Sequence, residues 1–198
     1  MIKAVIFDLN GIFVQAPRLG ERLEKDFGLK QEIFLPNLHR IMHEIRKRNA
    51  KPAFSYWGPF LQEHKINFSE KDFWNYWFGS EKVSEQMVAF SKKLKQQGIK
   101  VFVLSNNFKE RSEYYGLYPW IHEAVDKVYF SWQTGFIKPN LAAWQLVLSK
   151  NNLKPEECIY FDDKEKNLKA SEEVGIKAFQ FTNEQELERI VNEELNKK

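Results

Sequence analysis

The sequence predicts an α/β fold in which a parallel sheet forms the core and an all-helical cap is inserted into it. Short apolar segments of strand length alternate with helical patterns over the C-terminal half of the chain. Such alternation is typical of βαβ units in a Rossmann-like sheet. Residues 15–82 break the alternation because they read as helices only. We therefore expect a core of residues 1–14 and 83–198 and a cap of residues 15–82.

Five apolar segments are expected to form the strands of the sheet. Each is short and rich in Val, Ile, Phe or Tyr, as strands buried on both faces usually are. In chain order they are residues 2–7, 100–104, 127–130, 158–161 and 177–181. Because parallel strands need long crossover connections, the segments between them are expected to contain helices.

Helices are expected where apolar residues recur every three or four positions between start and stop signals. Gly28 is such a stop signal, and Ser69–Asp72 resembles a capping box at a helix start. The segments are 17–28, 35–48 and one from residue 69 in the cap, and 87–97, 141–148, 166–174 and 187–195 in the core.

Aromatic residues are concentrated in one part of the expected cap. Ten of them lie between Phe54 and Phe78. Large apolar side chains usually pack against one another, so we expect most of these to form the interior of the cap. The alternative is an aromatic wall that covers a ligand.

Composition narrows the class of protein. The chain of 198 residues has a net charge of only +3, which is too small to indicate a nucleic-acid partner. No apolar run reaches the ~20 residues that a membrane-spanning helix needs. Cys158 is the only cysteine, so no intrachain disulfide can form, as is usual in a reducing compartment. We expect a soluble cytoplasmic protein that binds neither nucleic acid nor membrane.

Polar side chains follow four of the expected strands. Taken singly, each has an ordinary explanation as a helix cap, a turn former or a surface charge. In an open parallel sheet, however, ligands bind beyond the carboxyl ends of the strands, so these side chains are expected to share one site. In chain order they are Asp8 and Asn10, Ser105 and Asn106, Lys138, and Asp162 and Asp163.

The residue types in this set indicate phosphoryl transfer. Three clustered carboxylates repel one another and need a counter-charge, which a hard divalent cation such as Mg²⁺ supplies through oxygen ligands. A lysine adds a second positive charge, and a hydroxyl and an amide can donate hydrogen bonds to phosphate oxygens. An aspartate in such a site can act as the attacking group.

These segments resemble the four motifs of the haloacid dehalogenase superfamily. The first motif of that family usually reads DxDG[TV], and Asp8-Leu-Asn-Gly11 is similar to it. The other three matching segments are 103–106, 135–139 and 161–168, and the helical insert corresponds to the helical cap of the family. From residue 103 to 176 the pattern is similar to the branch that contains α-D-glucose-1-phosphate phosphatase.

The resemblance implies a catalytic mechanism. Asp8 would attack the phosphorus of a small phosphomonoester and become an aspartyl-phosphate, which water then hydrolyses. Ser105 and Asn106 would hold the phosphoryl oxygens. Lys138 would offset the charge of Asp8 and of the intermediate. A sugar phosphate is the first candidate for the substrate.

The resemblance also implies a Mg²⁺ site. Its ligands would be Asp8, the backbone carbonyl of Asn10, and Asp163, with Asp162 assisting. Position 10 departs from the family pattern, because the usual Asp there protonates the leaving group and activates water. An amide does neither, so a slow phosphatase is expected.

Two alternatives to a slow phosphatase follow from Asn10. One is a dehalogenase-type hydrolase, although that branch carries Tyr at this position and needs no Mg²⁺. The other is a pseudoenzyme that binds a phosphorylated ligand, or a protein partner through its aromatic cap, without turnover.

Several other polar residues of the expected cap have ordinary interpretations. His39 and His43 are four residues apart on an expected helix, but no third metal ligand accompanies them. The basic run 46–48, with Lys51, could attract phosphate to the cap, but such a run is more often a solvated helix face, and this is what we expect. Arg18 lies where the chain leaves the core, and it is a weak candidate for substrate contact.

Overall fold

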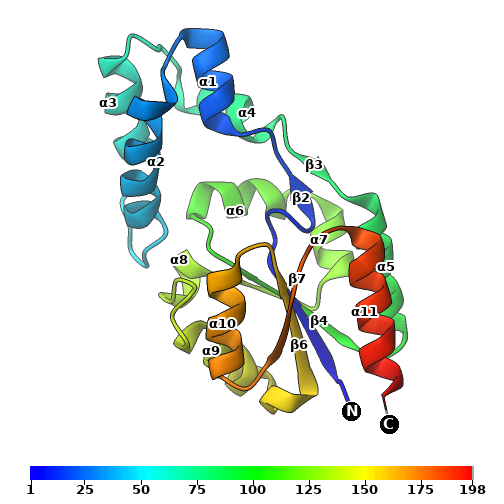
Figure 1. Cartoon of the computed structure of the whole chain (residues 1–198). Helices are drawn as coiled ribbons and strands as arrows, with labels where there is room; N and C mark the ends of the chain where they lie inside the picture. The colour runs from blue at the N-terminus through cyan, green and yellow to red at the C-terminus, as the bar shows by residue number, and fades with distance from the viewer. Residues whose placement is uncertain (198) are drawn as a thin grey trace.

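Five parallel strands form the centre of the core (Figure 1) in the computed structural model, which describes residues 1–197. Their order across the sheet is β5-β4-β1-β6-β7, and every neighbouring pair runs parallel. This confirms the predicted fold class, and the strand ends lie within two residues of the expected ones. The strands are β1 (Ala4–Phe7), β4 (Lys100–Ser105), β5 (Lys127–Phe130), β6 (Cys158–Asp162) and β7 (Lys177–Gln180).

Eight helical segments within residues 1–197 accompany this sheet in the core. Four of them were not expected from the sequence, because α6 lacks an apolar stripe and α7, α8 and η1 each span less than two turns. The segments are α5 (Glu85–Gln96), α6 (Lys109–Gly116), α7 (Pro119–Ala124), α8 (Ser131–Thr134), α9 (Ala142–Asn151), the 3₁₀ helix η1 (Pro155–Glu157), α10 (Glu165–Glu173) and α11 (Glu184–Asn196).

The helices cover both faces of the sheet, which makes three layers (Figure 1). Side chains of β1 alternate between the two faces, as the pleat of a strand requires. Val5 and Phe7 pack with apolar residues of α5, α7 and α11. Ala4 and Ile6 pack on the opposite face with residues of α9 and α10. Because every residue of β1 is fully buried, this strand lies at the centre of the core.

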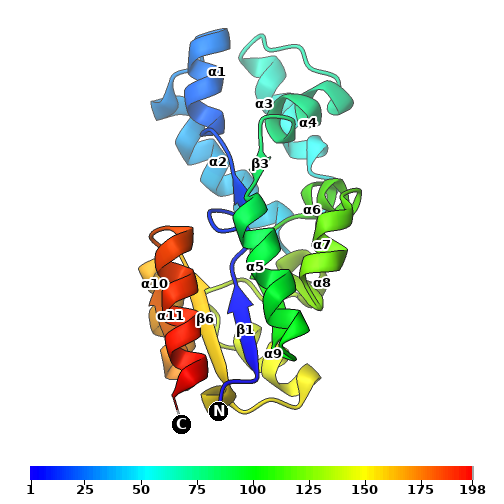
Figure 2. The ribbon, with the colours of Figure 1, turned by 90° about the vertical axis from the view of Figure 1, so that its right-hand side faces the viewer.

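A helical cap is attached to the core through two chain connections that lie side by side (Figure 2). The connections pair as an antiparallel ladder of β2 (Val14–Gln15) and β3 (Lys82–Val83). The expected domain boundaries fall within these two strands, and the division into two units stays a prediction. The cap helices are α1 (Leu19–Phe27), α2 (Gln31–Ile45), α3 (Phe54–Glu63) and α4 (Glu70–Phe78).

Aromatic side chains fill the interior of the cap, as expected. Phe34, Trp57 and Phe73 are fully buried in one apolar cluster of the cap helices. The helix α2 begins at residue 31 rather than 35, and one turn of it precedes the exposed Pro36. Burial of Phe34 accounts for this earlier start, because it adds a large apolar side chain to the cluster.

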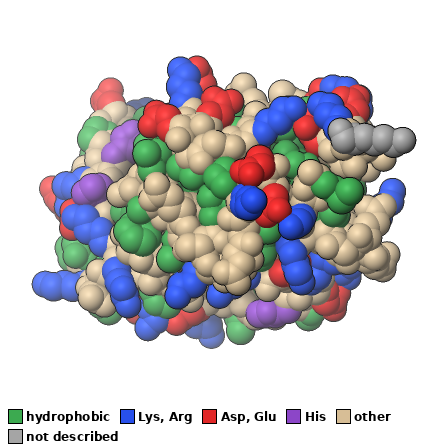
Figure 3. Space-filling model, turned by 90° about the horizontal axis from the view of Figure 1, so that it is seen from below, with side chains coloured by type: hydrophobic (Ala, Val, Ile, Leu, Met, Phe, Trp, Pro, Cys, Tyr) green, Lys and Arg blue, Asp and Glu red, His purple; other side chains and the backbone are tan. Residues whose placement is uncertain are grey.

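The surface at the end of the core that carries the chain termini has charges of both signs. Acidic and basic side chains both occur there among apolar ones (Figure 3). None of the helices in residues 1–197 is long and apolar enough to cross a bilayer. Cys158 is buried, and burial raises the pKa of its thiol to about 12. A cytoplasmic location and the absence of a nucleic-acid partner stay predictions.

Replacing Phe73 by Ala is expected to destabilise the protein strongly. The ring is fully buried and packs against Phe54, Trp57 and Trp77. Its loss leaves a cavity that costs about 3–5 kcal/mol in the free energy of unfolding. Urea denaturation measures the change, and Leu117→Ala, at a position 78% exposed, is the control expected to change little.

Candidate functional site

Polar side chains meet at the carboxyl end of the three central strands. Asp8 follows β1, Ser105 ends β4 and Asp162 ends β6. The chain runs outward from β1 on one side through β4 and β5, and on the other through β6 and β7. Such a topological switch point is where open α/β sheets bind their ligands.

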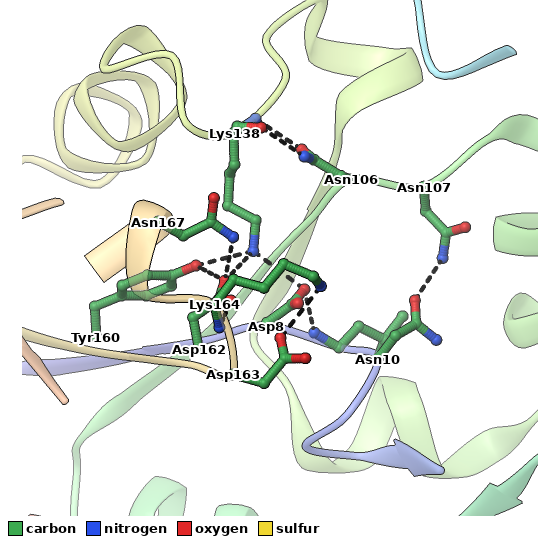
Figure 4. Close-up of polar contacts among 11 residues, drawn as sticks. Asp8, Asn10, Asn106, Asn107, Lys138, Tyr160, Asp162, Asp163, Lys164 and Asn167 are labelled. Carbon is green, nitrogen blue, oxygen red and sulfur yellow. Dashed lines mark hydrogen bonds and ion pairs between the residues drawn. The ribbon is translucent and has the colours of Figure 1, made fainter. Parts of the chain in front are cut away.

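Lys138 is the buried centre of charge at this edge (Figure 4). Its Nζ lies 3.1 Å from Asp8 Oδ1 and 2.7 Å from Asp162 Oδ2. Burial by itself would raise the pKa of Asp162, but the ammonium of Lys138 and further hydrogen bonds lower it to about 2. One cation thus lies between two buried carboxylates and favours the charged form of Asp162.

Asp162 has both carboxylate oxygens engaged by donors. Its Oδ2 accepts hydrogen bonds from Lys138, from the Tyr160 hydroxyl and, at 2.9 Å, from Asn167 Nδ2. Its Oδ1 accepts one from the backbone N–H of Lys164 at 2.9 Å. This carboxylate therefore serves to hold Lys138 in place. Tyr160 and Asn167 were not predicted, because neither belongs to the polar clusters that directly follow the strands.

Asn106 holds Lys138 from the other side. Its Oδ1 accepts a hydrogen bond from the Lys138 backbone N–H, and its Nδ2 donates one to the Lys138 carbonyl, each at 2.8 Å. The side chain was expected to bind phosphoryl oxygens. In the structure both of its polar groups bind the backbone of Lys138 (Figure 4).

Three carboxylates of the site lie close enough to share a cation. One oxygen each of Asp8, Asp162 and Asp163 lies within 4.8 Å of the other two. Burial raises the pKa of Asp163, and repulsion from Asp8 and Asp162 adds to the rise, although Lys164 opposes it. A divalent cation with oxygen ligands would relieve that repulsion, so the donor set fits Mg²⁺.

Gly11 lies in the turn after β1, next to the loop that carries Asp163. Its φ is +97°, a conformation that L side chains rarely adopt. A Cβ atom there would lie 3.4 Å from Asp163 Cγ. The turn after β1 therefore favours glycine at this position, whereas a Cβ atom would make only an ordinary contact with Asp163.

Asn10 points away from the carboxylates (Figure 4). Its Nδ2 donates to the Tyr115 hydroxyl at 2.9 Å, and its Oδ1 accepts a weaker hydrogen bond from Asn107 Nδ2 at 3.4 Å. The Tyr115 hydroxyl in turn donates to Glu81 Oε2 at 2.6 Å. The amide is thus one member of a hydrogen-bonded chain that reaches the connection between cap and core.

A buried ion pair completes that chain. Arg111, on α6, pairs with Glu81, which lies between α4 and β3. Burial opposes the charge of Arg111, but the neighbouring Tyr115 and Glu81 outweigh it and raise its pKa. Glu81, Arg111 and Tyr115 were not expected, because no sequence motif places the cap connection beside the site.

Several of these side chains line a cavity of about 140 Å³. It is small beside the roughly 300–1,000 Å³ of common ligand pockets, which indicates a small ligand. A larger cavity of about 800 Å³ lies beside α2 and α6, and none of the predicted site residues lines it. The small cavity is lined by Asp8, Asn10, Arg46, Ser105, Asn106, Arg111, Lys138, Lys164, Lys166 and Asn167.

Arg46 was wrongly expected to belong to a solvated helix face. It directly follows α2, is only partly exposed and lines the small cavity. Arg18, by contrast, has an 84% exposed side chain and pairs with Glu21 outside the cavity. His39 and His43 are also exposed. Arg46 lines the cavity because of where the folded cap lies, which the local sequence pattern does not indicate.

Sequence comparison relates the chain to hydrolases from animals and bacteria. It is 24% identical to bifunctional epoxide hydrolase 2 of Sus scrofa, with 88% of the chain matched to 35% of that protein. It is 30% identical to D-ribitol-5-phosphate phosphatase of Bacteroides thetaiotaomicron, over 36% of the chain and 37% of the phosphatase. The chain thus matches little more than a third of either relative.

Solved structures share the whole architecture. An enzyme of the haloacid dehalogenase family from Bacteroides thetaiotaomicron, in complex with magnesium and inorganic phosphate, superposes with a TM-score of 0.78. It is 22% identical, and the match covers 92% of this chain and 95% of that one. A model of the haloacid dehalogenase-like hydrolases matches residues 2–175, and the chain belongs to this family of hydrolases.

Proposed function

We propose that this chain is a Mg²⁺-dependent hydrolase of small phosphomonoesters and that Asp8 is its nucleophile. The observation that carries the proposal is the position of Asp8. It lies in the small cavity beside the buried cation Lys138 and within 4.8 Å, oxygen to oxygen, of two further carboxylates. The solved neighbour that contains magnesium and phosphate supports the same chemistry.

The two oxygens of Asp8 have different surroundings. Oδ1 accepts a hydrogen bond from the Leu9 backbone N–H at 2.8 Å and lies beside Lys138. No hydrogen bond to Oδ2 is formed within residues 1–197. Oδ2 is therefore the oxygen free to attack phosphorus. A bond from Oδ2 to phosphorus would form as the bond to the leaving alkoxide breaks, and water would then hydrolyse the aspartyl-phosphate.

The metal ligands are proposed to be Asp8, Asp163 and the backbone carbonyl of Asn10. When bound, Mg²⁺ neutralises the charge of the phosphoryl group and of the carboxylates. Asp162 is assigned a different part, because its oxygens already accept four hydrogen bonds. It holds the ammonium of Lys138 in place.

The phosphoryl group is proposed to lie between Ser105 and Lys138. Both side chains line the cavity with Asp8. A hydroxyl and an ammonium can donate hydrogen bonds to phosphoryl oxygens, and such charge-assisted bonds are the stronger kind. Asn106 contributes indirectly, since its amide fixes the backbone of Lys138. A sugar phosphate remains the first candidate for the substrate, with D-ribitol-5-phosphate phosphatase among the relatives.

Asn10 supports a second candidate function, which is binding of a phosphorylated ligand without turnover. Its amide is held by Tyr115 and Asn107 and supplies no proton near neutral pH. A dehalogenase-type reaction is less well supported, because the carboxylate cluster fits a metal and residue 10 is not Tyr. Turnover of a phosphomonoester separates the two candidates.

Hydrolysis of p-nitrophenyl phosphate is expected to require both Mg²⁺ and Asp8. Removing the ion with EDTA leaves the carboxylates and the phosphate dianion to repel each other, so the rate should fall to background. Asp8→Asn keeps the shape of the side chain but removes the nucleophile, and it should abolish turnover at any Mg²⁺ concentration. Activity that persists in EDTA would contradict the metal requirement.

Replacing Asn10 by Asp is expected to raise kcat by at least about tenfold, because general acid–base catalysis contributes roughly 10²–10⁴-fold. The Tyr115 hydroxyl accepts a hydrogen bond from the Asn10 amide and donates one to Glu81. The Tyr115 oxygen would favour the protonated form of a carboxyl group at position 10, and this proton would be transferred to the leaving alkoxide as its bond to phosphorus breaks. Asn10→Ala, which supplies no acid, is the matched control; equal rates for the two variants would count against the account.

Replacing Lys138 by Met is expected to cost roughly 3–5 kcal/mol in the free energy of unfolding at pH 7, because two buried carboxylates lose their cation. The pKa of Asp162 is about 2 in the folded state, below the ordinary value near 3.9. The ion pair of Asp162 with Lys138 therefore stabilises the fold above pH ~4, and this stabilisation is lost as the pH falls towards 2. The difference in unfolding free energy between the wild-type protein and the variant should shrink on acidification. Urea denaturation across this range measures it.

The control for Lys138→Met is Lys166→Met. Lys166 lines the same cavity but is exposed. Its replacement should change stability little at any pH. A deficit of Lys138→Met that stays constant from pH 7 to pH 3 would show that the ion pairs are not its cause.

A further inference from the structure

Arg46 brings an unsatisfied cation from the cap into the cavity that contains Asp8. It lies at the C-terminal end of α2 and lines this cavity. Its Nε is buried and has no hydrogen-bond partner within residues 1–197. Burial and the neighbouring Arg111 lower the pKa of Arg46 to about 10, although Asp8 opposes the change. The charge of this guanidinium is therefore poorly compensated by its surroundings.

Arg111 adds a second guanidinium to the same side of the cavity. Its Nε is also buried without a partner in the described part of the chain, although another of its nitrogens pairs with Glu81. The carboxylates nearby are already engaged: Glu81 by Arg111 and Tyr115, and Asp8 by Lys138. Among residues 1–197, no carboxylate forms an ion pair with Arg46.

An anion from outside the protein would remove this imbalance. A buried cation without a partner is costly, and its charge is compensated when a carboxylate or phosphate binds it. The planar guanidinium donates two parallel hydrogen bonds to a carboxylate, which makes arginine the preferred residue for such recognition. Arg46 lines the cavity and forms no ion pair within residues 1–197, so its guanidinium is available to an anionic ligand there.

The position of Arg46 indicates which part of the substrate it meets. Asp8 attacks from the sheet edge, and in phosphoryl transfer the leaving oxygen lies roughly in line on the opposite side of phosphorus. Arg46 belongs to the cap, whereas Asp8, Ser105 and Lys138 belong to the core. A substrate whose phosphoryl group lies against Asp8, Ser105 and Lys138 would therefore present its leaving group to Arg46.

We propose that Arg46, together with Arg111, forms an anion subsite for a carboxylate on the leaving group, so that the substrate is a small phosphorylated carboxylic acid. This assignment rests on the proposed phosphatase function for its orientation. The cavity of about 140 Å³ favours a carboxylate over a second, bulkier phosphate. It makes Arg46 a residue that determines substrate specificity.

Binding of non-hydrolysable phosphonates tests the subsite without any need for turnover. Two ligands of similar size are compared by isothermal titration calorimetry in MgCl₂: 3-phosphonopropionate, which carries a carboxylate, and propylphosphonate, which carries a methyl group instead. The wild-type protein is expected to bind the carboxylate ligand about 10- to 100-fold more tightly, the range that a charged hydrogen bond supplies. Equal affinities would overturn the proposal.

Variants assign the preference to Arg46. Arg46→Gln should abolish the preference for 3-phosphonopropionate, so that the two phosphonates bind with equal affinity, although both lose the attraction of the buried charge. Arg46→Lys, which keeps the charge but not the paired donors, should retain part of the preference. Arg48→Gln is the matched control, because this arginine is exposed two residues away and does not line the cavity. A preference that survives in Arg46→Gln would overturn the assignment.

Three further results test the choice of a carboxylate and separate the subsite from the proposed function. Tighter binding of ethane-1,2-bisphosphonate than of 3-phosphonopropionate would overturn the choice of a carboxylate. A preference that depends on Arg46 in a protein that hydrolyses no phosphomonoester would support the subsite and refute the phosphatase. Turnover of p-nitrophenyl phosphate with no preference for the carboxylate ligand would support the phosphatase and refute the subsite.

Discussion

The ion pairs of Lys138 with Asp8 and Asp162 are the interaction on which the site depends. Three strands end at one edge of the sheet, and the three carboxylates that lie there would repel one another without a cation between them. Lys138 is 3% exposed. Asn106 forms hydrogen bonds with its backbone, and its ammonium group donates to Tyr160 and Asp162. This double attachment holds the charge beside Asp8.

A second network links the site to the cap. It runs from Asn10 through Tyr115 and Glu81 to Arg111. Glu81 lies at the return connection from the cap, so any movement of the cap relative to the core acts on a buried ion pair next to the cavity. Position 10, where the family usually has an acid, is in this protein tied to the connection that carries the cap.

Most of the fold could be predicted from the sequence because its signals are local. Apolar segments and their bounding residues predicted all five strands of the core sheet, and Gly28 ended the first cap helix in a left-handed conformation. The helix α6 was not predicted because it has no apolar stripe. Its position follows from contacts with α4 and α7. The early start of α2 was hidden by Pro36 and set by burial of Phe34.

For the site, the sequence by itself determined which polar residues end the strands, since a parallel sheet brings the carboxyl ends of its strands to one edge. Asp8 and Ser105 were found in this way, Lys138 was found in the loop beyond β5, and all three line one cavity. Only the tertiary structure decided what faces them. Arg46 and Glu81 are remote from every motif and reach the site because the cap folds over it. Burial and pairing depend on neighbours distant in the chain, and no local pattern encodes them.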